Sequence, residues 1–211
     1  MERNSNSRKT IAVFGGSRVE RDSPQYAEAY QVGARLAQAG FTVLNGGYAG
    51  TMEASAKGAR EAGGRVVGVS SKLFTQNVLN EFIDEEIPTD DLYNRIRELI
   101  VRGDGYIVLR GSIGTLAELH IVWNLATLEP GFDKVIVLLG DFWKDVIQTY
   151  ERTLAVDERQ TRYLQFASTP EECVEILQRR LNDAPTPLAG GEVVSQGDAP
   201  LPRAPSPPNE R

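Results

Sequence analysis

Residues 105–118 read GYIVLRGSIGTLAE, and they combine three features that decide the fold. A short apolar run ends in a turn that contains Gly111 and Gly114, and a helical pattern follows directly. The first N–H groups of a helix have no partner within the helix, and the helix dipole adds positive charge at this end. The stretch therefore predicts a strand, a turn and a helix start that together bind an anion, with the carboxylate of Glu118 one turn further along.

Strand and helix patterns alternate along the rest of the chain. Short runs rich in Val, Ile and Leu and bounded by glycine are typical of strands buried on both faces. We expect strands at 11–17, 42–47, 65–70, 105–111, 134–140 and 163–168, and helices at 24–39, 51–62, 90–102, 115–128, 141–154 and 170–182. This alternation predicts an α/β fold, a single domain with a doubly wound, Rossmann-like parallel sheet flanked by helices. In such folds the ligand binds at the carboxyl ends of the strands.

The composition predicts where the folded domain begins and ends. The chain has 211 residues, 41% of them hydrophobic, which suits one globular domain. Seven of the 11 prolines follow Ala184, in a segment with few large apolar residues. We expect a flexible N-terminus at residues 1–9, the folded domain at 10–182 and a disordered, Pro-rich tail at 183–211.

Charge and residue counts exclude several classes of partner. A net charge of -6 argues against binding to nucleic acid. The single cysteine, Cys173, cannot form an internal disulfide, which is typical of the cytoplasm. No apolar run reaches the roughly 20 residues that span a membrane. One histidine and one cysteine give no metal site, and no lysine has a context typical of a pyridoxal phosphate enzyme, so we expect no cofactor.

Three of the expected strands end in glycine-rich loops. These loops read GGS at residues 15–17, NGGYAGT at 45–51 and GSIGT at 111–115. Glycine lets the backbone approach a ligand closely, although an α/β fold also needs glycine simply to turn from strand to helix. Three such loops at one edge of the sheet favour a nucleotide-sized site. Their spacing fits neither the Walker A loop nor the dinucleotide fingerprint.

The chain resembles the Lonely Guy family of cytokinin-activating phosphoribohydrolases, formerly described as lysine decarboxylases. The family motif P-G-G-x-G-T-x-x-E corresponds to RGSIGTLAE at residues 110–118, and the family spacing places its functional arginine at Arg95. Similar segments read VFGGS at residues 13–17 and NGGYAGTMEASAKGAREAGGRVVGV at 45–69. Arg110 replaces the proline of the motif. Ser112 replaces its second glycine and would be strained if that position needs a positive φ.

The resemblance implies hydrolysis of the N-glycosidic bond of a nucleoside 5′-monophosphate to a free base and ribose 5-phosphate. Positive charge develops on the ribose as the base leaves, and a nearby carboxylate stabilises it or orients the attacking water. Glu118 and Arg95 are the catalytic residues that the resemblance implies. Contacts with the nucleotide are expected from Gly16, Ser17, Gly46, Gly47, Gly50, Thr51, Gly111, Ser112, Gly114 and Thr115.

Each of these expectations has a simpler alternative. Residues 115–118 also fit a capping box, in which Glu118 binds the start of its own helix. Arg95 fits an ordinary solvated arginine as well, and Arg110 either adds a cation near the phosphate or points away. The resemblance implies a homodimer, and the apolar face of the helix at 115–128 suits either the core or a dimer interface. A non-catalytic nucleotide-binding or sensing protein on the same fold is the alternative function.

Overall fold

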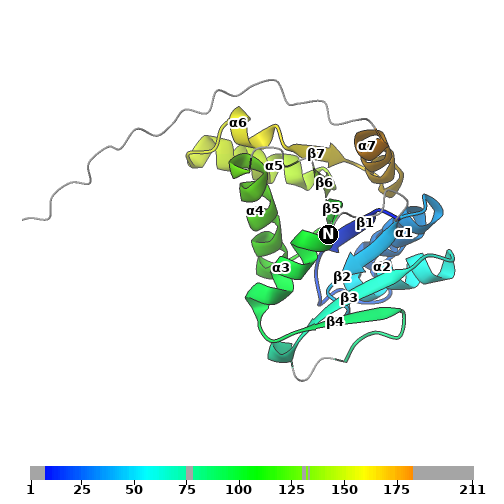
Figure 1. Cartoon of the computed structure of the whole chain (residues 1–211). Coiled ribbons are helices and arrows are strands. Elements are labelled where there is room, and N and C mark those ends of the chain that lie inside the picture. The colour runs from blue at the N-terminus through cyan, green and yellow to red at the C-terminus, as the bar shows by residue number, and fades with distance from the viewer. Residues whose placement is uncertain (1–7, 75–77, 130–131, 133, 183–211) are drawn as a thin grey trace, which may run out of the picture.

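The computed structural model describes residues 8–74, 78–129, 132 and 134–182. The expected tail at 183–211 lies outside these residues, as does the expected flexible N-terminus except for residues 8 and 9. The described chain forms a parallel sheet with helices on both faces, which confirms the doubly wound single domain (Figure 1). None of the described helices is long and apolar enough to cross a bilayer.

The strands are β1 (Thr10–Phe14), β2 (Thr42–Asn45), β3 (Val66–Ser71), β4 (Glu85–Thr89), β5 (Gly105–Val108), β6 (Val135–Leu139) and β7 (Leu164–Ala167). The helices are α1 (Pro24–Gln38), α2 (Thr51–Glu61), α3 (Leu92–Arg102), α4 (Ile113–Leu128), α5 (Phe142–Thr153), α6 (Glu158–Thr161) and α7 (Pro170–Asn182), with a 3-10 turn η1 (Lys72–Phe74).

The order of the strands creates a topological switch point at the centre of the sheet. The strands run β4-β3-β2-β1-β5-β6-β7, and all neighbours are parallel. The chain moves outward from β1 to β4 and then returns to the centre at β5, so the direction of winding reverses between β1 and β5. Open α/β sheets bind ligands at this switch point, outside the carboxyl ends of the strands. Phe14 pairs with Val108 there, so the loops after β1 and β5 lie next to each other.

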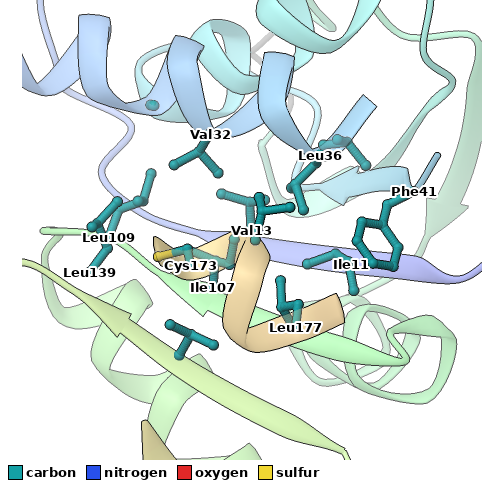
Figure 2. Close-up of a cluster of buried hydrophobic side chains, with 14 of the residues drawn as sticks. Ile11, Val13, Val32, Leu36, Phe41, Ile107, Leu109, Leu139, Cys173 and Leu177 are labelled. Atoms are coloured by element: carbon teal, nitrogen blue, oxygen red, sulfur yellow. The ribbon is translucent and has the colours of Figure 1, made fainter. Parts of the chain in front are cut away.

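Both faces of the sheet are buried. Helices α1, α2 and α7 cover one face, and α3, α4 and α5 cover the other (Figure 1). On the first face, Val13 and Ile107 of the sheet pack against Val32 of α1 and Leu177 of α7 (Figure 2). Neighbouring residues such as Phe14 point to the opposite face. The central strands therefore need apolar side chains at every position, which explains their continuous apolar runs.

The sequence patterns missed β4 and the short helix α6. Strand β4 reads EEIPT, is mostly exposed and pairs with β3 alone, so it lacks the apolar run of a central strand. Pro88 is tolerated because β4 is an edge strand, where one side of the backbone needs no partner. The expected strands at 11–17 and 105–111 end earlier, at Phe14 and Val108, where the glycine-rich loops begin.

Candidate functional site

Three glycine-rich loops meet at the carboxyl edge of the sheet, and Gly16 lies at their junction. The backbone N–H of Thr51 and its hydroxyl both donate to the Gly16 carbonyl, at 2.9 and 3.2 Å. Gly50 has a φ of +70°, and a Cβ there would lie 2.3 Å from the same carbonyl oxygen. A Cβ on Gly16 would lie 3.7 Å from Gly111 Cα, in the loop after β5. Both hydrogen-bond donors of Thr51 therefore link the loop after β2 to the loop after β1. Ser17 is exposed beside this junction.

The start of α4 lies directly after the loop that follows β5, where the sequence predicted an anion site. The helix begins at Ile113, and Ser112 precedes it with an extended φ of -111°, so the expected strain at Ser112 is absent. Among the described residues, the Thr115 hydroxyl is a buried side-chain group without a hydrogen-bond partner. A buried polar group left unpaired costs about 1–3 kcal/mol, so this hydroxyl suits a polar ligand. A Cβ on Gly111 would lie 2.0 Å from that oxygen, whereas a Cβ on Gly114 would meet open space.

The position of Glu118 rules out the capping box. Because α4 begins two residues before the expected start, Thr115 is its third residue and cannot be the N-cap. The Glu118 carboxylate instead faces Arg95, with Oε1 4.0 Å from Nη1. Only 12% of the Glu118 side chain and 8% of the Arg95 side chain is exposed. The structure therefore brings together the two residues that the family resemblance singled out.

Arg95 is held in place by the backbone of two neighbouring strand ends. Asp91 is the N-cap of helix α3, and its carboxylate accepts from the backbone N–H of Asn94 at 2.8 Å. One turn into the helix, Arg95 Nε donates to the Val69 carbonyl at 2.9 Å, and Nη2 donates to the Gly46 carbonyl at 3.2 Å. A Cβ on Gly46 would lie 1.8 Å from Nη2, so any side chain there would displace the guanidinium. Arg95 is thus a buried, fixed cation and not an ordinary solvated arginine.

Two aromatic rings complete the surroundings of Arg95, and the sequence patterns did not identify either. The Arg95 Cζ lies 5.5 Å from the Tyr48 ring centre and 5.3 Å from the Phe74 ring centre. Cation–π attraction at these distances favours the charged guanidinium. Tyr48 lies within the NGGYAGT loop, which offered a signal, whereas nothing in residues 72–74 marks Phe74.

Burial shifts the pKa values of both charged groups. Burial raises the pKa of Glu118 to about 7, although the nearby Arg95 opposes the shift. Burial lowers the pKa of Arg95, and Glu118 opposes that shift in turn. A carboxyl group with a pKa near 7 exchanges its proton at neutral pH, and such groups cluster at functional sites. Within the described residues, no group of three or more His, Cys, Asp and Glu side chains is arranged to bind a metal ion.

The other charged residues near the loops have structural partners. Glu53, in the first turn of α2, binds Arg21 at 2.8 Å and accepts from the Tyr26 hydroxyl at 3.1 Å. This is the helix-start position that favours a negative charge. The guanidinium of Arg110 stacks on the Phe142 ring, 3.9 Å from its centre, at the start of α5. Arg110 therefore lies across the carboxyl ends of β5 and β6.

The fold and the site define a Rossmann-like α/β protein in which a helix starts beside a buried Arg–Glu pair at the carboxyl edge of the sheet. The model of the SLOG cluster4 family matches residues 8–174, and the chain belongs to this family. It is 38% identical to the cytokinin riboside 5′-monophosphate phosphoribohydrolase of Mycobacterium tuberculosis over 140 residues, which cover 64% of this chain and 71% of that protein. It is also 36% identical to an uncharacterized protein of Archaeoglobus fulgidus over 124 residues, 57% of this chain and 80% of that protein. The similarity to the Lonely Guy family is thus confirmed.

A solved structure has the same fold. The molybdenum cofactor binding protein of Rippkaea orientalis superimposes with a TM-score of 0.68 at 25% identity. The match covers 84% of this chain and 99% of that chain. The same architecture therefore occurs both in a protein named for binding a cofactor and, at the sequence level, among proteins named as hydrolases.

Proposed function

We propose that the protein hydrolyses the N-glycosidic bond of a nucleoside 5′-monophosphate to a free base and ribose 5-phosphate. The observation that supports this most is the buried Glu118–Arg95 pair, one helical turn from the unpaired hydroxyl of Thr115. Residues three apart lie on the same side of a helix, about 5 Å apart along its axis. A phosphate bound at the first turn of α4 therefore places the attached ribose beside Glu118.

The phosphate would bind to the start of α4. The first-turn N–H groups and the helix dipole attract the dianion, and the Thr115 hydroxyl donates a further hydrogen bond. Gly111 is needed because any side chain there would collide with Thr115. Ser112 and Gly114 would contribute backbone N–H groups, since both are exposed at the mouth of the site. The site thus recognises the 5′-phosphate with groups that do not depend on the base.

Glu118 would perform the chemistry on the ribose. The bond between C1′ and the base nitrogen breaks, its electron pair leaves with the base, and the base takes up a proton from the solvent. Water adds to C1′ and gives one proton to the carboxylate, which releases it to the solvent at the end of the cycle. The ionised carboxylate also stabilises the positive charge that develops on the ribose. Arg95 acts as a positioning residue, because its other N–H groups are bound to Val69 and Gly46 and its Nη1 faces Glu118.

A nucleotide-binding or sensing protein without catalysis is the second candidate. The likeness to the molybdenum cofactor binding protein favours it, because that match covers nearly the whole of that chain. Arg110 and Ser112, the two departures from the family motif, lie beside the proposed phosphate site and favour it as well. Retention of Glu118 and Arg95 in one buried pair favours the enzyme.

We also propose that a second copy of the chain covers the outer side of α4. This helix has apolar residues on its outer side as well as on its inner side: Leu119 and Val122 are buried, whereas Ile113 is 80% exposed and Ile121 is 40% exposed. Helices of this kind are normally covered on both sides. The neighbouring α3 leaves Tyr93 84% exposed, and a hollow of about 190 Å³ lies between the two helices. In a two-fold dimer the same apolar patch of each copy would cover that of the other.

Chromatography of products tests the proposed activity. The purified protein and Glu118→Gln are incubated with a panel of nucleoside monophosphates and the matching nucleosides. We expect free base from at least one monophosphate and none from nucleosides. Loss of the carboxylate should lower the rate by about 10²- to 10⁴-fold while nucleotide binding persists. Glu175→Gln, an exposed carboxylate on α7, is the matched control and should retain full activity. Binding without release by the wild type would favour the second candidate, and an active Glu118→Gln would overturn the mechanism.

A further inference from the structure

Two aromatic rings adjoin both the Arg95 guanidinium and each other. The ring centres of Tyr48 and Phe74 are 5.7 Å apart, with an angle of 74° between the ring planes. Each ring centre is also 5.3 to 5.5 Å from the Arg95 Cζ. The three centres form a nearly equilateral triangle, so the rings do not sandwich the guanidinium. We call Tyr48 and Phe74 the aromatic corner, and Arg95 lies next to both of its rings.

The two rings differ in what they offer to a ligand. Tyr48 is 6% exposed, and its hydroxyl accepts from the Ser71 N–H at 2.9 Å and donates to the Ser71 carbonyl at 3.3 Å. Its ring is therefore fixed and its polar group is occupied. Phe74 is partly exposed and follows β3 at the carboxyl edge of the sheet, where the ligand site lies. Phe74 is thus the member of the corner that a bound molecule reaches.

The order of these groups matches the order of parts in a nucleotide. Thr115 is one turn from Glu118, Glu118 is 4.0 Å from Arg95, and Arg95 is 5.3 Å from the Phe74 ring. In a nucleoside monophosphate the phosphate, the ribose and the base follow each other in the same way. We infer that Phe74, set beside Arg95 at the end of β3, is the surface on which the base stacks and the residue that sets base preference. The inference rests on the proposed nucleotide site.

Stacking on Phe74 discriminates between bases by their area. A phenyl ring has no hydrogen-bonding group, and every base has a π-face, so stacking tolerates different exocyclic groups. A purine covers more of the ring than a pyrimidine does. We therefore expect purine monophosphates to bind more tightly than pyrimidine monophosphates, and we expect this advantage to depend on Phe74.

Calorimetric titrations separate a contact with the base from an indirect effect. They use Glu118→Gln as the parent, so that bound nucleotide is not consumed, and three probes: adenosine 5′-monophosphate, uridine 5′-monophosphate and ribose 5-phosphate. Adding Phe74→Ala should lower the affinity for adenosine monophosphate by about 5- to 100-fold and the affinity for uridine monophosphate by less. Ribose 5-phosphate, which has no base, should change less than about twofold. Leu73→Ala, the exposed neighbour in the same turn, is the matched control and should change none of the three.

The other outcomes identify what failed. If Phe74→Ala weakens the binding of adenosine monophosphate and ribose 5-phosphate equally, Phe74 acts through Arg95. If it weakens the binding of neither, the base lies elsewhere. Both results overturn this inference and leave the proposed function standing. A parent and a wild type that bind neither ligand would overturn the proposed function together with the inference. If Phe74→Ala does not fold, Phe74→Leu keeps the volume without the π-face and takes its place, while Phe74→Tyr should restore binding.

Discussion

Glu118 shows how two opposing effects decide the charge of a buried residue. Removal from water favours its neutral form, and the positive charge of Arg95 favours its ionised form. Burial wins, so the pKa rises to about 7. Arg95 does not offset burial because its Nη1 is 4.0 Å away, beyond the 2.7–2.9 Å of a charge-assisted hydrogen bond. Its Nε and Nη2 are already bound to Val69 and Gly46.

The pH dependence of stability follows from this shift. A carboxyl group whose pKa is raised from 4.5 to about 7 on folding stabilises the folded state most below pH 4.5, and this contribution is lost as the pH rises through 7. Replacing Glu118 by Gln removes the loss. Relative to the wild type, Glu118→Gln should therefore gain about 2 kcal/mol in free energy of unfolding between pH 5 and pH 8. Urea denaturation at both pH values measures the gain, with Glu175→Gln as the control. A difference independent of pH would contradict the assigned pKa.

At the scale of the elements, burial decides what the sequence predicts. The central strands were predicted because both of their faces need apolar residues, whereas β4 was missed because an exposed edge strand does not. The start of α4 was predicted two residues late, at residue 115, because the glycine-containing residues 111–114 were assigned to the turn, whereas the helix begins at Ile113. The pairing of Arg95 with Glu118 came from family resemblance. Spacing alone cannot bring together residues of two different helices, and Phe74 had no signal at all.

The loop between β5 and α4 provides a test at this scale. A Cβ on Gly111 would lie 2.0 Å from Thr115 Oγ1, so Gly111→Ala must displace the hydroxyl that faces the proposed phosphate. We expect its affinity for ribose 5-phosphate to fall at least tenfold, since a hydrogen bond to a charged group contributes about 1.5–3 kcal/mol. Gly114→Ala is the matched change in the adjoining first turn of α4, and its Cβ meets open space, so its affinity for ribose 5-phosphate should fall less than about threefold. Titration calorimetry measures the affinity of both variants for ribose 5-phosphate. Equal losses of affinity would show that the Thr115 hydroxyl does not bind the phosphate.

At the scale of the whole molecule, every part of the proposed site lies at one edge of the sheet. Because winding reverses between β1 and β5, the loops after these strands diverge to opposite faces and leave room for a ligand between them. Helices α3 and α4 cover the same face, and they supply Arg95 and Glu118. The same two helices also present the apolar outer face. The site and the proposed dimer contact are therefore built on one pair of helices.

This arrangement predicts that dimerisation and activity are linked. Ile121, 40% exposed, lines the hollow between α3 and α4 and lies one turn from Glu118. Ile121→Asp would bury a charge in the contact between copies, which costs several kcal/mol. Light scattering during gel filtration should give about twice the 23.2 kDa chain mass for the wild type and the single-chain mass for the variant.

Leu154→Asp, a matched change at a 59% exposed leucine next to α5, should stay dimeric. Ile121→Asp should lose activity together with dimerisation, because it loosens the helices that hold the Arg–Glu pair. Leu154→Asp should keep its activity. A wild type of single-chain mass would show that the apolar face of α4 has another partner.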